Sequence, residues 1–242
     1  MKPLLRVTQL EKFRRYISGD YEYETEQAVI DSITGVFTGN AYTWIGTAFH
    51  RIVEGNTDGV IKAPEGERHF LYYGNDKTEP VPCGRTFDIE GNPVTLDIPQ
   101  CQVAIAYKNE HPQAFHEIRQ WKDYGEVTIT GQADIIDGLE IRDIKTKYST
   151  PDDKDYINSC QWRFYLDLFE LDTFYFDLFV FEDYKLEKHG TDVRGLPLYR
   201  HDPPITCYRY PTMEQDNENL LCEFIEWAKF RDLFDKLPKY EK

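Results

Sequence analysis

The feature that most restricts the fold of this 242-residue chain is the dipeptide Asp137-Gly138, which lies between two stretches rich in Val, Ile and Thr. These stretches, 126–136 and 139–146, have the composition of β-strands. Asp-Gly is among the strongest short signals for a tight hairpin turn. Residues 115–121 have the same strand-like character, so we predict an antiparallel meander of three strands.

The rest of the chain alternates between helical and strand patterns. Some segments carry apolar residues at three- and four-residue spacing, and others are short and aromatic. We predict helices over 6–17, 41–54, 99–110, 152–171 and 213–237, and further strands over 173–181 and 205–210. A meander followed by helix, strand and helix indicates an α/β fold, with a central mixed β-sheet flanked by helices on both faces.

The length of the chain favours one decorated domain that spans residues 1–242. Its N-terminal part, about 1–55, is expected to be helical. Gly, Pro and charged residues dominate 56–99, so we predict a largely irregular segment there that is a family-specific insertion. A hydrophobic content of 40% suffices for a core without disulfides or a structural metal.

Cysteine usage and hydropathy indicate the compartment. The five cysteines are widely scattered and include no Cys-x-x-Cys pair, which favours reduced, structural thiols. No run approaches the roughly 18 consecutive apolar residues of a membrane span, and the first residues lack the apolar stretch of a secretory signal. We therefore expect a cytoplasmic protein with no membrane partner.

Net charge restricts the partners. The chain carries 28 Lys and Arg against 43 Asp and Glu, a formal charge of −15, so it repels a polyanion at long range. Nucleic acid binding then requires a basic or metal-loaded cleft, or an oligomer that gathers its cationic surface on one side.

The hairpin also carries the chemistry. Asp134 and Asp143 lie nine positions apart across the tight turn, so their carboxylates can converge, and Lys145 shares the face of Asp143 because strand side chains alternate. Two carboxylates and the backbone carbonyl of Ile144 are the oxygen ligands that Mg²⁺ and Mn²⁺ prefer. An Asp-x-Lys triplet in a strand is by itself more often a surface ion pair.

Two helical segments add polar residues at four-residue spacing. His50 and Glu54 share a face of the helix predicted over 41–54, and Gln161 and Tyr165 share a face of the helix that follows the hairpin. Each pattern alone has an ordinary explanation, since a lone histidine is usually a satisfied core residue and such a tyrosine usually packs.

Taken together, these segments resemble a known family. Gly46-Thr47-Ala48-Phe49-His50, Gly131-Gln132-Ala133-Asp134, Asp143-Ile144-Lys145-Thr146 and Gln161-Trp162-Arg163-Phe164-Tyr165 are similar, in order, to the motifs of the RecB-like branch of the PD-(D/E)XK nucleases. Within it, Ala63-Pro64-Glu65-Gly66 and the strand around Glu117 resemble the phage-type RecE, YqaJ and lambda exonuclease group. A departure is Ala133 where the family usually has proline.

The resemblance implies a restriction-endonuclease-like core and a metal-dependent DNA exonuclease. It implies metal ligation by His50, Asp134, Asp143 and the carbonyl of Ile144, with Lys145 orienting water and Glu117 helping to place a metal or the water. Gln161 and Tyr165 would contact DNA or brace the site. The role of Glu54 is left open: it either binds an outer-shell water or only caps the helix surface.

The same resemblance implies cofactors and partners. One or two Mg²⁺ or Mn²⁺ ions are expected, and no iron-sulfur cluster, because Cys207 and Cys222 lie fifteen apart. DNA, as a duplex end or a single strand, is the expected partner, together with a homo-oligomeric ring and a single-strand annealing protein. Candidate phosphate contacts are Arg142, Lys147 and Arg163 near the hairpin, and Lys12, Arg14 and Arg15 on the first helix, although exposed basic residues are by default solvated.

Three functions stay open at this point. The first is an exonuclease of recombination, repair or phage DNA processing. The second is a non-catalytic module that mimics DNA or binds a nuclease, and the third is a restriction-type endonuclease on the same core. The complete set His50, Asp134, Asp143 and Lys145 favours an active nuclease, because a retired site has no chemical need for all four.

Overall fold

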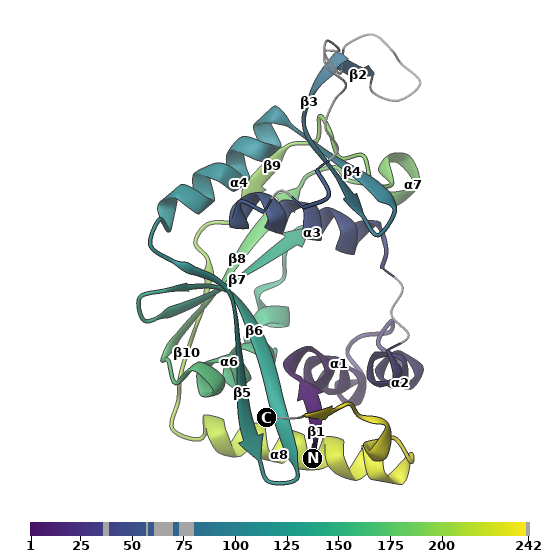
Figure 1. Ribbon diagram of the computed structural model, residues 1–242, viewed down its shortest axis with the longest axis vertical. Coiled ribbons are helices and arrows are strands. Elements are labelled where there is room, and N and C mark those ends of the chain that lie inside the picture. Colours follow the sequence, from purple (N-terminus) through teal and green to yellow (C-terminus); the bar gives the residue numbers. More distant parts are fainter. Residues whose placement is uncertain (36–38, 57, 61–69, 73–79, 241–242) are drawn as a thin grey trace.

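A mixed sheet of eight strands forms the centre of the molecule (Figure 1). The computed structural model describes residues 1–35, 39–56, 58–60, 70–72 and 80–240. Neighbouring strands follow the order β10-β8-β7-β6-β1-β11, with β5 paired to β6 and β9 paired to β8. The strands are β1 Lys2–Arg6, β5 Phe115–Tyr124, β6 Val127–Asp137, β7 Glu140–Lys147, β8 Thr173–Phe181, β9 Leu198–Arg200, β10 Ile205–Tyr208 and β11 Lys239–Tyr240.

The predicted meander of β5, β6 and β7 is confirmed. The β6 and β7 strands are joined at Asp137↔Glu140, and Gly138 adopts a φ of 59° in the turn between them, a conformation that glycine tolerates without steric cost. The pairs β1/β6 and β7/β8 are parallel, whereas the other pairs of this sheet are antiparallel. This is the predicted α/β fold with a mixed sheet, and it is consistent with a restriction-endonuclease-like core.

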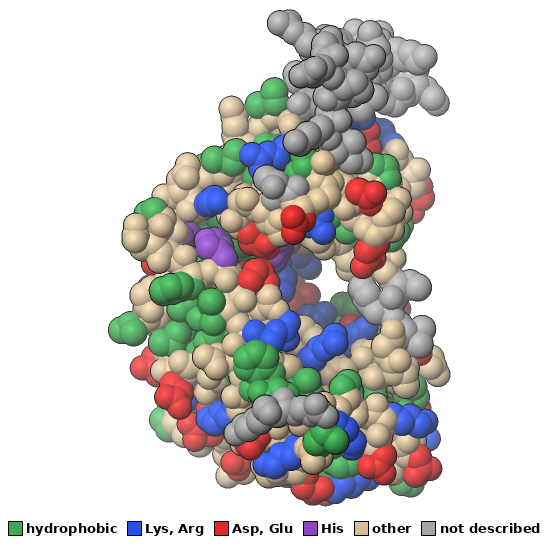
Figure 2. Space-filling model, in the orientation of Figure 1, with side chains coloured by type: hydrophobic (Ala, Val, Ile, Leu, Met, Phe, Trp, Pro, Cys, Tyr) green, Lys and Arg blue, Asp and Glu red, His purple; other side chains and the backbone are tan. Residues whose placement is uncertain are grey.

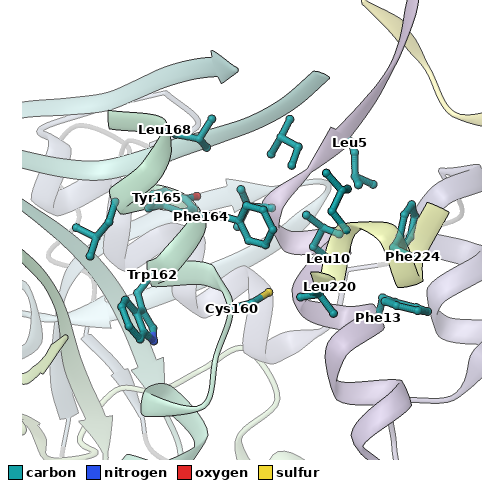
Figure 3. Close-up of a cluster of buried hydrophobic side chains, with 14 of the residues drawn as sticks. Leu5, Leu10, Phe13, Cys160, Trp162, Phe164, Tyr165, Leu168, Leu220 and Phe224 are labelled. Atoms are coloured by element: carbon teal, nitrogen blue, oxygen red, sulfur yellow. The ribbon is translucent and has the colours of Figure 1, made fainter. Parts of the chain in front are cut away.

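Helices cover both faces of the sheet. Along β8, Phe174, Phe176 and Leu178 belong to one buried cluster, whereas Phe179 and Phe181 belong to another, as the alternation of strand side chains requires. The first cluster packs against α1, α6 and α8 (Figure 3). The second packs against α3, α4 and the hairpin of β3 (Pro80–Ile89) and β4 (Asn92–Asp97). The main helices are α1 Val7–Ser18, α2 Glu26–Thr34, α3 Ala41–Glu54, α4 Ile98–Glu110, α6 Gln161–Phe169 and α8 Met213–Phe230.

The predicted helix over 41–54 is confirmed with both of its ends. The side chain of Asn40 accepts a hydrogen bond from the backbone of Thr43 at the N-terminus, and Gly55 ends the helix at a φ of 76°. The helix predicted over 99–110 is also confirmed as α4, where Asp97 caps the N-terminus.

The segment predicted as one helix over 152–171 is instead two helices, α5 Asp153–Ile157 and α6. The break lies at Asn158–Cys160, and its cause is a tertiary contact. The backbone N–H of Cys160 donates to Glu11 Oε2 at 2.8 Å rather than to a carbonyl of the preceding turn. Similarly, the helix predicted to reach 237 ends at Phe230, beyond which Asp232 has a φ of 54° and the short helix η1 Phe234–Lys236 follows.

The sequence patterns missed β1 and α2 and did not place strands within 56–99. There, β3 Pro80–Ile89 and β4 Asn92–Asp97 form a hairpin, and β2 Phe70–Tyr72 pairs with β3. The hairpin turn is Glu90-Gly91, with both residues at positive φ, and Glu-Gly is not among the usual signals for such a turn. Ala63-Pro64-Glu65-Gly66 lies outside the described residues.

The short helix α7 Leu186–His189 follows β8, and the chain then leads into β9. Among the described residues, no helix combines the length and the apolar character that crossing a bilayer would demand.

Candidate active site

The site lies where the central sheet forks. On one edge of β6, the β7 strand pairs only with residues 135–137, and β1 pairs only with residues 128–130. The β5 strand occupies the other edge. Residues 131–134, the segment Gly131-Gln132-Ala133-Asp134, therefore face a gap between β1 and β7, because β7 leaves β6 to follow β8.

Side chains satisfy the backbone groups that this fork leaves without a strand partner. Asp134 Oδ2 accepts the backbone N–H of Ile144 at 2.7 Å, and the hydroxyl of Tyr165 donates to the carbonyl of Gln132 at 2.8 Å. Gly131 allows α6 to approach, since a Cβ there would lie 2.9 Å from Leu168 Cδ1. The fork is thus held open by specific bonds.

Three carboxylates occupy one row across the three strands. Continuing the β5/β6 register places Glu117 opposite Asp134, and continuing the β6/β7 register places Asp134 opposite Asp143. Glu117 itself is not paired with β6, and its φ of 55° is unusual for a residue other than glycine. The row therefore lies where the β5/β6 pairing is interrupted and the β6/β7 pairing ends. Asp134 and Asp143 line the same cavity there, which agrees with the expectation that they converge.

His50 reaches this row from α3. Its Nε2 lies 3.0 Å from the carbonyl oxygen of Ile144, and because a carbonyl only accepts, Nε2 carries the hydrogen. Nδ1 is then the basic nitrogen, 3.9 Å from Asp134 Oδ1. One ligand atom each of His50, Glu117 and Asp134 lie within 4.8 Å of one another, so this group could hold a metal ion.

Asp143 and Lys145 form a pair beside that group. Asp143 is buried and accepts a hydrogen bond from Gln161 Nε2 at 2.7 Å, while Lys145 Nζ lies 2.7 Å from its other oxygen. Burial raises the pKa of Asp143 to about 6, against the opposing charge of Lys145. Burial also acts to lower the pKa of Lys145, but Asp143 and Asp134 outweigh it and raise that pKa.

Negative charge is crowded at the group. Burial, together with the carboxylates of Asp134 and Glu54, raises the pKa of Glu117 to about 7. Glu54 lies one turn beyond His50 and lines the same cavity. A bound cation would offset this repulsion, so the electrostatics fit a metal-binding site.

Two cavities meet at the row. One has a volume of about 780 Å³ and is lined by α3 and the end of β7, and the other has a volume of about 720 Å³ and is lined by β1, β5 and α6. Glu117, Asp134 and Lys145 line both. Figure 2 shows the molecule hollowed between its upper and lower halves, with acidic side chains above the hollow and basic side chains below it.

Of the five residues predicted to contact DNA, two lie at the row and three lie away from both cavities. Gln161 and Tyr165 brace the row through the bonds described above. Arg142 pairs with the buried Asp177 at 2.9 Å, the Lys147 ammonium lies 5.6 Å from the Tyr156 ring, and Arg163 donates to the Tyr210 hydroxyl at 3.2 Å. Neither cavity is lined by Arg142, Lys147 or Arg163, so their contact with DNA stays a prediction.

The basic residues of the first helix are also engaged within the chain. Glu11 Oε1 accepts from Arg14 at 2.8 Å and from Arg15 at 2.7 Å. Glu11 itself was not singled out from the sequence, nor were Arg6, Arg119 and Trp121, which line the second cavity. Arg119 and Trp121 lie two and four residues after Glu117, a spacing that places all three on the same face of β5.

Comparisons with known proteins give weak similarities. No protein-family model matches the chain, and no curated protein matches it in sequence. The solved structure of SSO0001 is 15% identical, over 94% of this chain and 77% of that one, with a TM-score of 0.42. A protein from Eubacterium rectale, described as a putative exonuclease, is 11% identical over 98% of this chain and 83% of that one, with a TM-score of 0.47. At these values neither likeness establishes a shared family or activity.

Proposed function

We propose that the chain is a metal-dependent deoxyribonuclease, and more specifically an exonuclease that hydrolyses phosphodiester bonds in the presence of Mg²⁺ or Mn²⁺. The observation that carries the proposal is the row of Glu117, Asp134 and Asp143 with His50 above it and Lys145 beside it. A carboxylate-rich group next to an ammonium is suited to phosphoryl chemistry. A role in recombination, repair or phage DNA processing follows from the sequence resemblance.

Each residue has a distinct task in this proposal. His50 Nδ1 and the carboxylates of Glu117 and Asp134 would hold the ion, and the sequence resemblance adds Asp143 and the Ile144 carbonyl as further ligands. A bound divalent cation supplies positive charge to the phosphate. Lys145 Nζ, held by Asp143, can donate a hydrogen bond to the attacking water or to a phosphoryl oxygen in the space that both cavities share.

Gln161 and Tyr165 hold the row in place, and because both also line the second cavity, their direct contact with DNA stays a prediction. Gln161 fixes the carboxylate of Asp143, and Tyr165 fixes the backbone of Gln132 two residues before Asp134. Their loss would misplace the charged groups without removing any of them, and small misplacements are costly in catalysis.

A cleavage assay tests the proposal. The purified chain is incubated with linear duplex, closed circular duplex and single-stranded DNA, with Mg²⁺, Mn²⁺ or a chelator. We expect degradation of DNA with free ends and none of closed circles. Cutting of closed circles would instead indicate a restriction-type endonuclease, and an absence of cleavage with either metal would indicate a non-catalytic binding module.

Lys145→Ala separates the catalytic role from metal binding. We expect cleavage to fall by a factor of about 10² to 10³, typical of losing one group that stabilises developing charge, while the variant still binds Mn²⁺. Lys188→Ala, an exposed lysine on α7, is the matched control and should cleave like the wild type. Undiminished cleavage by Lys145→Ala would contradict the mechanism.

A further inference from the structure

The second cavity carries a surface that the proposed chemistry does not use. The Trp121 side chain is 42% exposed there, although it is one of the largest apolar side chains, and its ring stacks on Tyr240 at a centroid distance of 6.0 Å and an interplanar angle of 21°. The inner face of the indole is therefore supported by the protein, while part of the ring remains open to solvent. A rigid aromatic ring of this kind is a platform for stacking.

Basic side chains accompany this platform. Arg6 and Arg119 are exposed and line the same cavity. The acidic residues of its lining are Glu117, Asp134 and Asp143, which all belong to the row. Among the described residues that line this cavity beyond the row, the charged side chains are therefore positive, in a chain whose net charge is −15.

The platform is connected to the row. Arg119 donates to the side-chain oxygen of Gln132, whose amide nitrogen donates to Glu117. Because Glu117, Arg119 and Trp121 alternate along β5, they present one face to the cavity. In the part of the chain that the structure describes, no acidic side chain pairs with Arg6, which leaves its guanidinium available to an anion.

We propose that the second cavity binds an unpaired DNA strand next to the scissile phosphate, with a base stacked on Trp121 and phosphates paired with Arg6 and Arg119. Aromatic rings interleaved with cations are the common means by which proteins bind single strands without sequence preference. This inference rests on the proposed nuclease function and gives its substrate: a strand that is single-stranded on this side of the site.

The size of the cavity suits one nucleotide with its phosphates. Its volume of about 720 Å³ is within the usual range for small-ligand sites. The choice of a single strand over a duplex rests on the exposed face of Trp121, because the faces of bases inside a duplex are already covered by neighbouring bases.

The test measures binding apart from cleavage. The anisotropy of a fluorescein-labelled oligo(dT) of fifteen residues is followed with Ca²⁺ in place of Mg²⁺, and the intact length of the probe is checked on a gel. We expect Trp121→Ala to weaken binding by about tenfold or more, as the loss of one stacked base does. Trp121→Phe, which keeps a ring, should recover most of the affinity, and a blunt duplex of equal length should bind more weakly than oligo(dT).

Matched variants control for the fold and for charge. Tyr208→Ala removes an aromatic ring that is 63% exposed on β10 and lines neither cavity, so it should leave binding unchanged. Arg119→Ala and Arg6→Ala should each reduce the slope of log K against log salt concentration by about 0.7, the value for one phosphate contact on a single strand. Lys188→Ala should not change this slope.

The outcomes separate this inference from the proposed function. If the wild type cleaves DNA but Trp121→Ala binds oligo(dT) as tightly as the wild type, the inference is overturned and the nuclease function stands. If binding depends on Trp121 while no metal supports cleavage, the nuclease function fails and the binding site stands. Equal weakening by Trp121→Ala and Tyr208→Ala would also overturn the inference.

Discussion

Glu117 should make the metal-free protein less stable at high pH, so that Glu117→Gln stabilises it. Burial, Asp134 and Glu54 raise the pKa of Glu117 from its ordinary value of 4.5 to about 7. The folded state then holds this proton more tightly than the unfolded state. Stability is unaffected by Glu117 below pH 4.5, falls as the pH rises from 4.5 to about 7, and stays reduced above 7.

The magnitude follows from the size of this change. A rise from 4.5 to about 7 corresponds to about 3.4 kcal/mol of lost stability, at about 1.36 kcal/mol for each pH unit. The side chain is only half-buried, so solvent screening reduces the effect to about 1 to 2 kcal/mol. Glu117→Gln should therefore raise the free energy of unfolding by about 1 to 2 kcal/mol at pH 8 and leave it unchanged at pH 4.

Urea unfolding with a chelator at both pH values measures this difference. Added Mn²⁺ supplies the second measurement, because an ion that binds only the folded state at a hundred times its Kd stabilises it by about 2.7 kcal/mol. The wild type should gain this stability and Glu117→Gln should lose most of the gain. Glu187→Gln, an exposed acid on α7, is the control. A variant that is destabilised at pH 8, and still responds fully to Mn²⁺, would refute the reasoning.

Two further predictions concern the framework that holds the row. Glu11→Gln should lower the free energy of unfolding by about 3 kcal/mol, since it breaks a buried ion pair. Burial opposes a lowered pKa for Glu11, but Arg14 and Arg15 lower it. Its contribution is therefore present above pH 4.5 and lost as the pH falls through the lowered pKa, so acid titration should destabilise the wild type more than the variant. Gly131→Ala should cost about 1 to 3 kcal/mol and reduce cleavage, because its Cβ would lie 2.9 Å from Leu168 Cδ1; wild-type unfolding and cleavage curves would contradict it.

Local sequence signals predicted the elements that are decided locally. The hairpin around Asp137-Gly138 and the helix that ends at Gly55 have strong turn and cap residues, and both are present. The break at Cys160 could not be predicted in this way, because it depends on Glu11, which lies 149 positions away. The turn at Glu90-Gly91 lacks the residues that usually mark such turns.

The candidate site also combines features that local sequence signals predicted with features that depend on distant parts of the chain. Strand alternation and the hairpin turn were enough to bring Asp134 and Asp143 together with Lys145 beside them, although they meet where the sheet forks and not at one end of it. They could not reveal that β6 and β7 separate at this point, because this follows from the parallel pairing of β7 with β8. Glu117 lies where the pairing of β5 with β6 is interrupted. Periodicity does not predict such an interruption, and Glu117 was therefore proposed as a site residue from the family resemblance.

Anomalous scattering from a crystal grown with Mn²⁺ tests the central proposal most directly. It predicts a manganese peak between Nδ1 of His50 and the carboxylates of Glu117 and Asp134, with Lys145 Nζ still beside Asp143. The same map would show whether Asp143 joins the coordination. A crystal that binds manganese elsewhere, or an imidazole of His50 turned away from the carboxylates, would contradict the proposed metal site.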